Sequence, residues 1–201
     1  MLQPRVLQRD QELIQIVDRA LAEAQQLSGS WIACRHGCFQ CCIGPFPITP
    51  LDAVRLRAGF AELAARDPDR ARRVRERAQA SVARFRRDFP EDPVARVLEI
   101  EDAADDEPCP ALDPESGACD LYASRPIMCR TFGPAVRFPS ESGEHTVGVC
   151  ELCYVGASDA QIAACQVEVD TRLESEMLRD LEQSMGICGD TLVAFVLAEA
   201  L

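Results

Sequence analysis

The stretch Cys34-Arg-His-Gly-Cys38-Phe-Gln-Cys41-Cys42 places four thiols within nine residues. Thiolates are soft, charged ligands that suit zinc ions and iron–sulfur clusters, and close spacing lets one loop present several of them at little entropic cost. Adjacent side chains tend to point apart, so Cys41 and Cys42 do not easily fill two corners of one closed tetrahedral site. Either two metals share this cluster, or one of the two cysteines faces inward and is structural.

The cysteine count bears on the compartment, because the chain has eleven cysteines among 201 residues. Its start lacks the layout of a secretory signal, and no apolar run approaches the roughly 20 residues of a spanning helix. We therefore expect a cytoplasmic protein with no membrane partner, whose thiols stay reduced and bind metal. The length suits a single domain over residues 1–201 that folds without disulfides.

Several classes of function are disfavoured by composition and motifs. The net charge of -12 argues against nucleic acid as a partner, since a phosphate backbone is met by excess positive charge. All 21 basic residues are arginine, which excludes lysine Schiff-base and phosphate-loop lysine chemistry. A cysteine protease with His145 as its base is conceivable, but clustered thiols fit metal better than a single activated nucleophile.

Helical patterns dominate the rest of the chain and predict a mainly α fold with irregular cysteine-rich loops. An apolar stripe predicts a helix over about residues 10–28. Thr49, Pro50 and Asp52 form the start signal of a second helix, and Asp67-Pro68 repeats it for a third over about 68–88. In the C-terminal region, about 158–201, Ser158 and Gln161 predict a long helix to about Met185, and Asp190 is expected to cap a final one ending at Leu201.

Charge changes sign between two neighbouring segments. Residues 66–88 hold nine arginines against four acids, whereas residues 91–107 hold eight acids against one arginine. We interpret the two as compensating each other within the molecule, in preference to a surface that docks nucleic acid or an acidic partner.

Further cysteines follow at ten-residue intervals, at Cys109, Cys119 and Cys129. Between the first two, Asp113-Pro114 and Ser116-Gly117 supply turn chemistry that predicts a small hairpin bringing Cys109 and Cys119 together. We expect metal to organise this hairpin and the loops.

Together, the cluster from Cys34 to Cys42, Cys109-Pro-Ala-Leu, Cys119-Asp-Leu-Tyr and Arg125-Pro-Ile-Met-Cys129-Arg130 resemble the YkgJ-type cysteine-cluster proteins, described as zinc- or iron-chelating domains. The resemblance covers about residues 31–153. It implies metal ligands at Cys34, Cys38, Cys41, Cys42, Cys109, Cys119 and Cys129, plus Cys150 or Cys153. The chain departs from the family pattern in the three residues between Cys34 and Cys38, and in offering two closing cysteines. A related cysteine-rich region occurs in flagellin lysine methylases, which allows S-adenosylmethionine-linked chemistry.

Other residues near the cysteines have competing interpretations. Cys165 and Cys188 are expected to be core residues, since free cysteine is among the most buried residue types. His36 is a secondary candidate ligand. Arg35, Arg125 and Arg130 could offset thiolate charge or, for the last two, bind an anionic cofactor, against the alternative of structural salt bridges. Tyr122 could pack beside the site, but we interpret it as a core aromatic.

Two functions follow from this. The first is a metal-binding module with a closed zinc or iron–sulfur site. The second is an iron or iron–sulfur enzyme with an open coordination position, supporting redox or S-adenosylmethionine-linked activity on a protein or small-molecule substrate.

Overall fold

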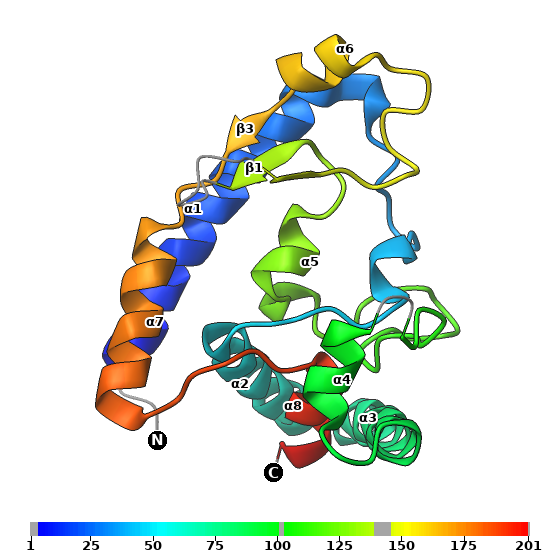
Figure 1. The fold of residues 1–201 in the computed structure, drawn as a ribbon, viewed down its shortest axis with the longest axis vertical. Helices are drawn as coiled ribbons and strands as arrows, with labels where there is room; N and C mark the ends of the chain where they lie inside the picture. The colour runs from blue at the N-terminus through cyan, green and yellow to red at the C-terminus, as the bar shows by residue number, and fades with distance from the viewer. Residues whose placement is uncertain (1–3, 101–102, 139–145, 201) are drawn as a thin grey trace. The chain divides into compact units, whose positions relative to one another are not determined.

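The computed structural model describes residues 4–100, 103–138 and 146–200 and divides into two compact units. Unit 1 consists of Met1–Arg35 and Ile127–Gly186, and unit 2 of His36–Pro126 and Ile187–Leu201. Helices make up most of the described chain, which confirms the mainly α fold class (Figure 1). The single domain over residues 1–201 stays a prediction, and His145 lies outside the described residues.

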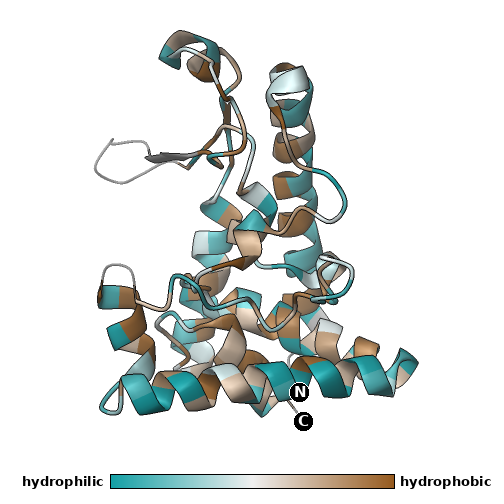
Figure 2. Ribbon diagram, turned by 90° about the vertical axis from the view of Figure 1, so that its right-hand side faces the viewer, coloured by the Kyte–Doolittle hydropathy of each residue, from teal (hydrophilic) through white to brown (hydrophobic). Residues whose placement is uncertain are grey.

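Unit 2 is built from three helices packed on one another, α2 (Pro50–Arg66), α3 (Pro68–Asp88) and α8 (Val193–Glu199). A short helix, α4 (Pro93–Glu99), packs on α3, and two 3-10 turns, η2 (Gln40–Cys42) and η3 (Tyr122–Ser124), lie in the loops. Phe60 and Phe85 are fully buried in the interior. Polar and apolar residues alternate along the helices, as expected when only one face is buried (Figure 2).

The predicted helix starts in unit 2 are confirmed. Thr49 accepts a hydrogen bond from the Asp52 backbone while the Asp52 carboxylate accepts one from the Thr49 backbone, so both halves of a capping box are present. Asp67 caps α3, whose bounds are those expected. The sequence interpretation missed α4, although Asp92-Pro93 carries the same signal and Asp92 does cap that helix.

Unit 1 pairs two long helices with a small sheet. Helix α1 (Pro4–Ser28) contacts α7 (Arg172–Met185), α5 (Ile127–Thr131) and the sheet (Figure 1). The sheet order is β2 (Thr146–Gly148), β1 (Val136–Phe138), β3 (Val167–Glu168), with β2 antiparallel and β3 parallel to the central β1. A 3-10 turn, η1 (Gly29–Trp31), follows α1. The predicted helix over about residues 10–28 is confirmed as α1, which begins six residues before the expected start.

The expectation of one long helix from Ser158 to Met185 is wrong. The capping box at Ser158 and Gln161 is present, but it opens only the short helix α6 (Asp159–Ala164). The chain then becomes extended, because the amides of Val167 and Val169 donate to the carbonyls of Ala135 and Arg137 on the neighbouring strand. Pairing with a distant strand outweighs the local helical pattern here.

The expected cap of the last helix is also wrong. Helix α8 begins at Val193, its N-cap is Leu192, and no side chain caps it. Thr191 instead exchanges backbone hydrogen bonds of 2.9 and 3.0 Å with Ile48 in an isolated antiparallel bridge. That extended pairing delays the helix by two residues beyond Asp190.

The predicted charge compensation between residues 66–88 and 91–107 is confirmed at one point. The Arg84 guanidinium lies 2.6 Å from the Glu107 carboxylate and 2.7 Å from that of Asp106. Within the described segments, no helix is long and apolar enough to cross a membrane.

Candidate metal centre

Two cysteines of the first cluster are positioned by backbone pairing in unit 2. Cys41 and Cys42 lie in η2, and the Cys42 carbonyl accepts a hydrogen bond of 2.7 Å from the Cys109 amide. An antiparallel bridge between Ile43 and Pro108 continues the pairing. The loop that carries the first cluster is therefore fixed beside the segment that carries Cys109.

A hairpin-like turn brings in Cys119. One antiparallel bridge joins Leu112 to Cys119, and hydrogen bonds from Asp113 to Ala118 and from Asp120 to Ala111 close the turn. At its tip Gly117 has a φ of +67°, and a Cβ there would lie 3.1 Å from the Gly37 carbonyl oxygen. Glycine therefore lets the tip approach the loop just before Cys38. Organisation of this turn by metal stays a prediction.

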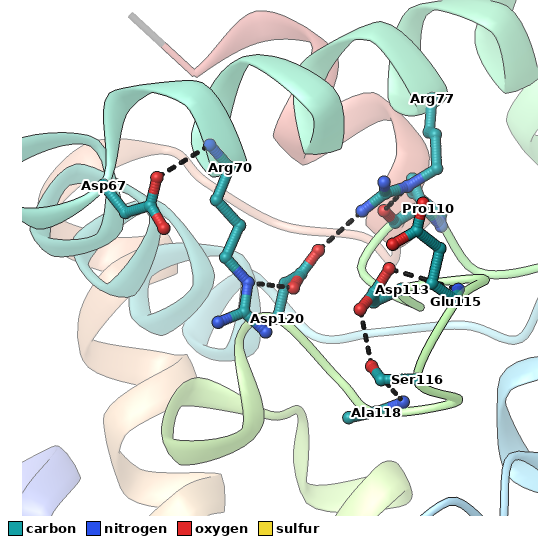
Figure 3. A network of polar contacts seen from close by, with 9 residues as sticks. All are labelled: Asp67, Arg70, Arg77, Pro110, Asp113, Glu115, Ser116, Ala118 and Asp120. Atoms are coloured by element: carbon teal, nitrogen blue, oxygen red, sulfur yellow. Dashed lines mark hydrogen bonds and ion pairs between the residues drawn. The ribbon is translucent and has the colours of Figure 1, made fainter.

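Arginines of α3 fix the turn from outside. The Asp120 side chain, only 2 % exposed, accepts from Arg70 and from Arg77, the latter at 2.6 Å. Arg77 also donates from Nε to the Pro110 carbonyl at 2.8 Å (Figure 3). Both ends of the segment from Cys109 to Cys119 are thus tied to one rigid helix, and the salt bridges of Asp120 are with Arg70 and Arg77.

Four thiols of unit 2 influence one another's ionisation. A hydrogen bond from Cys42 lowers the pKa of Cys41 to about 6, helped by the charge of Arg125, and the same bond raises the pKa of Cys42. Burial raises the pKa of Cys109 to about 12 and also raises that of Cys119. Thiolates at Cys109 and Cys119 further raise the pKa of Cys42, so added negative charge here needs a cation.

Arg125 brings positive charge to these thiols. Its guanidinium stacks 3.6 Å from the ring centre of Tyr122 and donates from Nε to the Tyr122 carbonyl at 3.0 Å. Its own carbonyl accepts from Arg55, which is paired with the buried Asp52. Tyr122 is 63 % exposed, so its interpretation as a core aromatic is wrong, because it serves as a platform for Arg125.

A second group of cysteines lies in unit 1. Cys150, Cys153 and Cys165 are buried in one cluster with Ala135 and Tyr154. The Ala33 amide donates to the Cys153 sulfur at 3.5 Å. Burial of Cys165 confirms its interpretation as core, whereas Cys188 is exposed, so that interpretation is wrong for it.

Tyr154 holds this cluster in place. Its hydroxyl accepts from the Ala135 amide at 2.8 Å and donates to Ser28 at 2.5 Å, since the Ser28 hydroxyl itself donates to Ala24. Tyr154 also has a φ of +56°, a left-handed conformation that side chains rarely adopt. The sequence interpretation missed this residue, although its place directly after Cys150-x-x-Cys153 was visible.

The remaining candidates divide between the units. In unit 1, Cys34 is exposed and Cys129 is half-buried, while Arg130 is buried and lies 2.8 Å from Asp18, which favours a structural role. In unit 2, Cys38 is half-buried and His36 is exposed. Arg35 of unit 1 donates to the Ala33 carbonyl at 3.5 Å. The metal and cofactor roles of these residues stay predictions.

The donor chemistry fits a thiophilic metal. All eleven cysteines are described and none is in a disulfide. In the described part of the chain, no three cysteine, histidine, aspartate or glutamate side chains already converge on one point that could hold a metal ion. Sulfur is nonetheless the donor common to both groups, which is typical of zinc and iron–sulfur sites. Ligation would require the thiols to turn toward one another.

Comparison with known proteins gives one match. A family model named CxxCxxCC and described as a "putative zinc- or iron-chelating domain" matches residues 33–153. No curated protein and no solved structure is similar enough to this chain to count as a match.

Proposed function

The chain belongs to this CxxCxxCC family of zinc- or iron-chelating domains, and on that premise we propose that it is a metal-binding module with a closed thiolate centre in unit 2. Its ligands are Cys41, Cys42, Cys109 and Cys119. Cys41 and Cys42 can serve one centre although they are adjacent, because their thiols share a hydrogen bond and therefore do not point apart. Cys38 precedes Cys41 by three residues on the same loop. The metal is zinc or an iron–sulfur cluster, the two classes that all-sulfur sites favour.

One observation carries this proposal, the mutual electrostatic influence of four thiols in one unit. Cys41, Cys109 and Cys119 all act on the ionisation of Cys42, although Cys109 and Cys119 lie more than 60 residues further along the chain. The turn from Cys109 to Cys119, its α3 anchors and the backbone pairing of Cys42 with Cys109 support this proposal, because they fix the backbone of these segments side by side. A cation bound among them would relieve the repulsion between thiolates and the cost of burying each charge.

A small cavity lies next to Cys109 in unit 2. Cys109 lines a cavity of about 30 Å³, together with Glu107, Ser81 and Leu192. A cavity of that size holds about two water molecules. Of the four proposed ligands only Cys109 lines this cavity, so the cavity describes the surroundings of Cys109 alone.

The test is metal analysis with an absorbance spectrum on protein purified without oxygen. We expect stoichiometric zinc with no visible band, or iron and sulfide with a broad visible band. The double variant Cys109→Ser, Cys119→Ser should lose that metal, while Cys188→Ser, which alters an exposed cysteine, should retain it. Metal-free wild-type protein, or equal metal in both variants, would contradict the proposal.

A further inference from the structure

Unit 1 contains predicted ligands that the centre in unit 2 does not use. We propose that unit 1 holds a separate metal centre, ligated by Cys34, Cys129, Cys150 and Cys153, so that the chain carries two thiolate centres. This inference rests on the proposed function, because it takes the same class of ion. It goes beyond the proposed function because it divides the predicted ligands by structural unit. Cys34 is assigned to unit 1 and Cys38 to unit 2, although both belong to one sequence cluster.

The turn from Cys150 to Tyr154 has the form of a chelating loop. Two residues separate its cysteines, which is a common ligand spacing in structural zinc sites. The Cys153 amide donates to the Cys150 carbonyl at 2.8 Å, which closes the turn. Tyr154 is held in a left-handed conformation that side chains rarely adopt, so the fold maintains this turn against local strain.

Backbone contacts bring Cys34 to the same place. The Tyr154 amide donates to the Trp31 carbonyl at 2.9 Å, and the Ala33 amide donates to the Cys153 sulfur. This contact fixes the Cys153 sulfur beside the backbone of the segment that carries Cys34. Cys34 is the next residue along this segment, which places it beside the turn.

Cys129 completes the set through Gly133. The Cys34 sulfur lies against Gly133, since a Cβ built there would be 2.8 Å away. Cys129 lies in α5 and precedes Gly133 by four residues, and the Phe132 amide donates to the Met128 carbonyl at 3.0 Å, so a single turn of chain joins Cys129 to Gly133. Binding would require the four side chains to turn so that their sulfurs converge.

Cys165 provides a matched control within the same cluster. It is as buried as Cys153, at 6 % exposure each. Its thiol donates to the Leu27 carbonyl at 3.4 Å, which requires the proton that a ligand would lose. We therefore leave it out of the ligand set.

The experiment counts metal ions on the full chain. Metal-free protein is titrated with Zn²⁺ without oxygen, in the presence of a competing chelator that removes weakly held ions, and read by native mass spectrometry. Wild type should bind two zinc ions. Cys150→Ser with Cys153→Ser should bind one, Cys109→Ser with Cys119→Ser should bind one, and Cys165→Ser should bind two.

A second pair of variants avoids the buried cluster. Cys34 and Cys188 are both exposed, so replacing either with serine leaves the interior intact. Cys34→Ser should lose one zinc ion and Cys188→Ser none, with unchanged helical circular dichroism. One zinc in wild type, abolished by either double variant, would overturn two centres in favour of one shared site. Two zinc ions retained in Cys34→Ser would overturn its ligand role, and no zinc at all in wild type would overturn the proposal of two zinc-binding centres. The proposed function has its own test, the metal analysis with an absorbance spectrum, so the two failures are distinguishable.

Discussion

The two units differ in what fills their interiors. Unit 2 has a large apolar core around Phe60, Leu56 and Val74, and Cys109 and Cys119 only pack against its edge. In the loop cluster of unit 1, three of the five buried residues are cysteines. A thiol buries less apolar surface than a leucine or phenylalanine, so this cluster gains less from the hydrophobic effect. On the proposal of two centres, unit 2 folds on its apolar core, whereas the loops of unit 1 depend on the metal that their thiols bind.

Metal removal should produce the largest difference between the two units, measured as loss of protection from hydrogen exchange. Chelation under reducing conditions should lower the protection of the Cys153, Tyr154 and Ala157 amides from hydrogen exchange by about 100-fold or more, because structural metal contributes on the order of 10 kcal/mol to its loops. Amides of α2 and α3 should change by less than about threefold. Hydrogen exchange read by mass spectrometry checks both segments in one sample.

Readdition of zinc is the control for this experiment and should restore protection at the turn. The proposed difference between the units would be refuted if chelation lowered the hydrogen-exchange protection of α3 as much as that of the turn from Cys150 to Tyr154. It would also be refuted if the turn kept its protection without metal.

The next effect in size concerns the core of unit 2. Phe60 is fully buried, so Phe60→Ala should lower the free energy of unfolding by about 3–5 kcal/mol through lost burial and the cavity left behind. Urea unfolding followed by circular dichroism measures this. Ile187→Ala, at an exposed site of the same unit, should cost less than about 1 kcal/mol. Equal effects of the two changes would argue against a metal-independent core.

A smaller effect is expected at the link between that core and the thiols. Asp120→Asn keeps the side-chain shape but removes the charge that Arg70 and Arg77 contact, and should cost about 2 kcal/mol. Zinc affinity of the Cys109 and Cys119 group should fall with it, because the turn loses its anchors. Asp69→Asn, at a carboxylate that is 80 % exposed, should change neither urea stability nor zinc affinity. An unchanged zinc affinity in Asp120→Asn would show that the salt bridges of Asp120 with Arg70 and Arg77 do not contribute to metal binding.

The sequence correctly predicted helix starts that depend on interactions between residues close together in the chain. The caps at Thr49 and Asp67 depend on residues three positions apart, and both are present. Backbone pairing between distant segments was not predictable. The residues around Thr191 and Val167 carry no signal that identifies Ile48 and Val136 as their pairing partners. The same holds for the cysteines. Spacing grouped Cys34 with Cys38, but the chain's topology divides them between units.

The smallest effect tests an exposed ion pair of unit 1 at the start of α7. Asp170 precedes α7 and accepts from the Arg172 amide at 3.0 Å and its guanidinium at 2.7 Å, and these bonds lower its pKa from 3.8 to about 2. The stability it contributes is therefore fully present above about pH 4 and is lost as the pH falls through about 2. Because the pair is exposed and screened, Asp170→Asn should cost less than about 0.5 kcal/mol at pH 7.

Urea unfolding of wild type and Asp170→Asn at several pH values checks this sign. Their difference should be constant from pH 5 to 8, shrink toward pH 3 and disappear in about 1 M salt, where the Debye length is about 3 Å. A difference that survives high salt would mean that Asp170 acts through its backbone hydrogen bond with Arg172, as a cap and not as a charge. In that case the small surface ion pairs of unit 1 would contribute even less to its stability, and more of that stability would have to come from α1, α7 and the cysteine-rich turn.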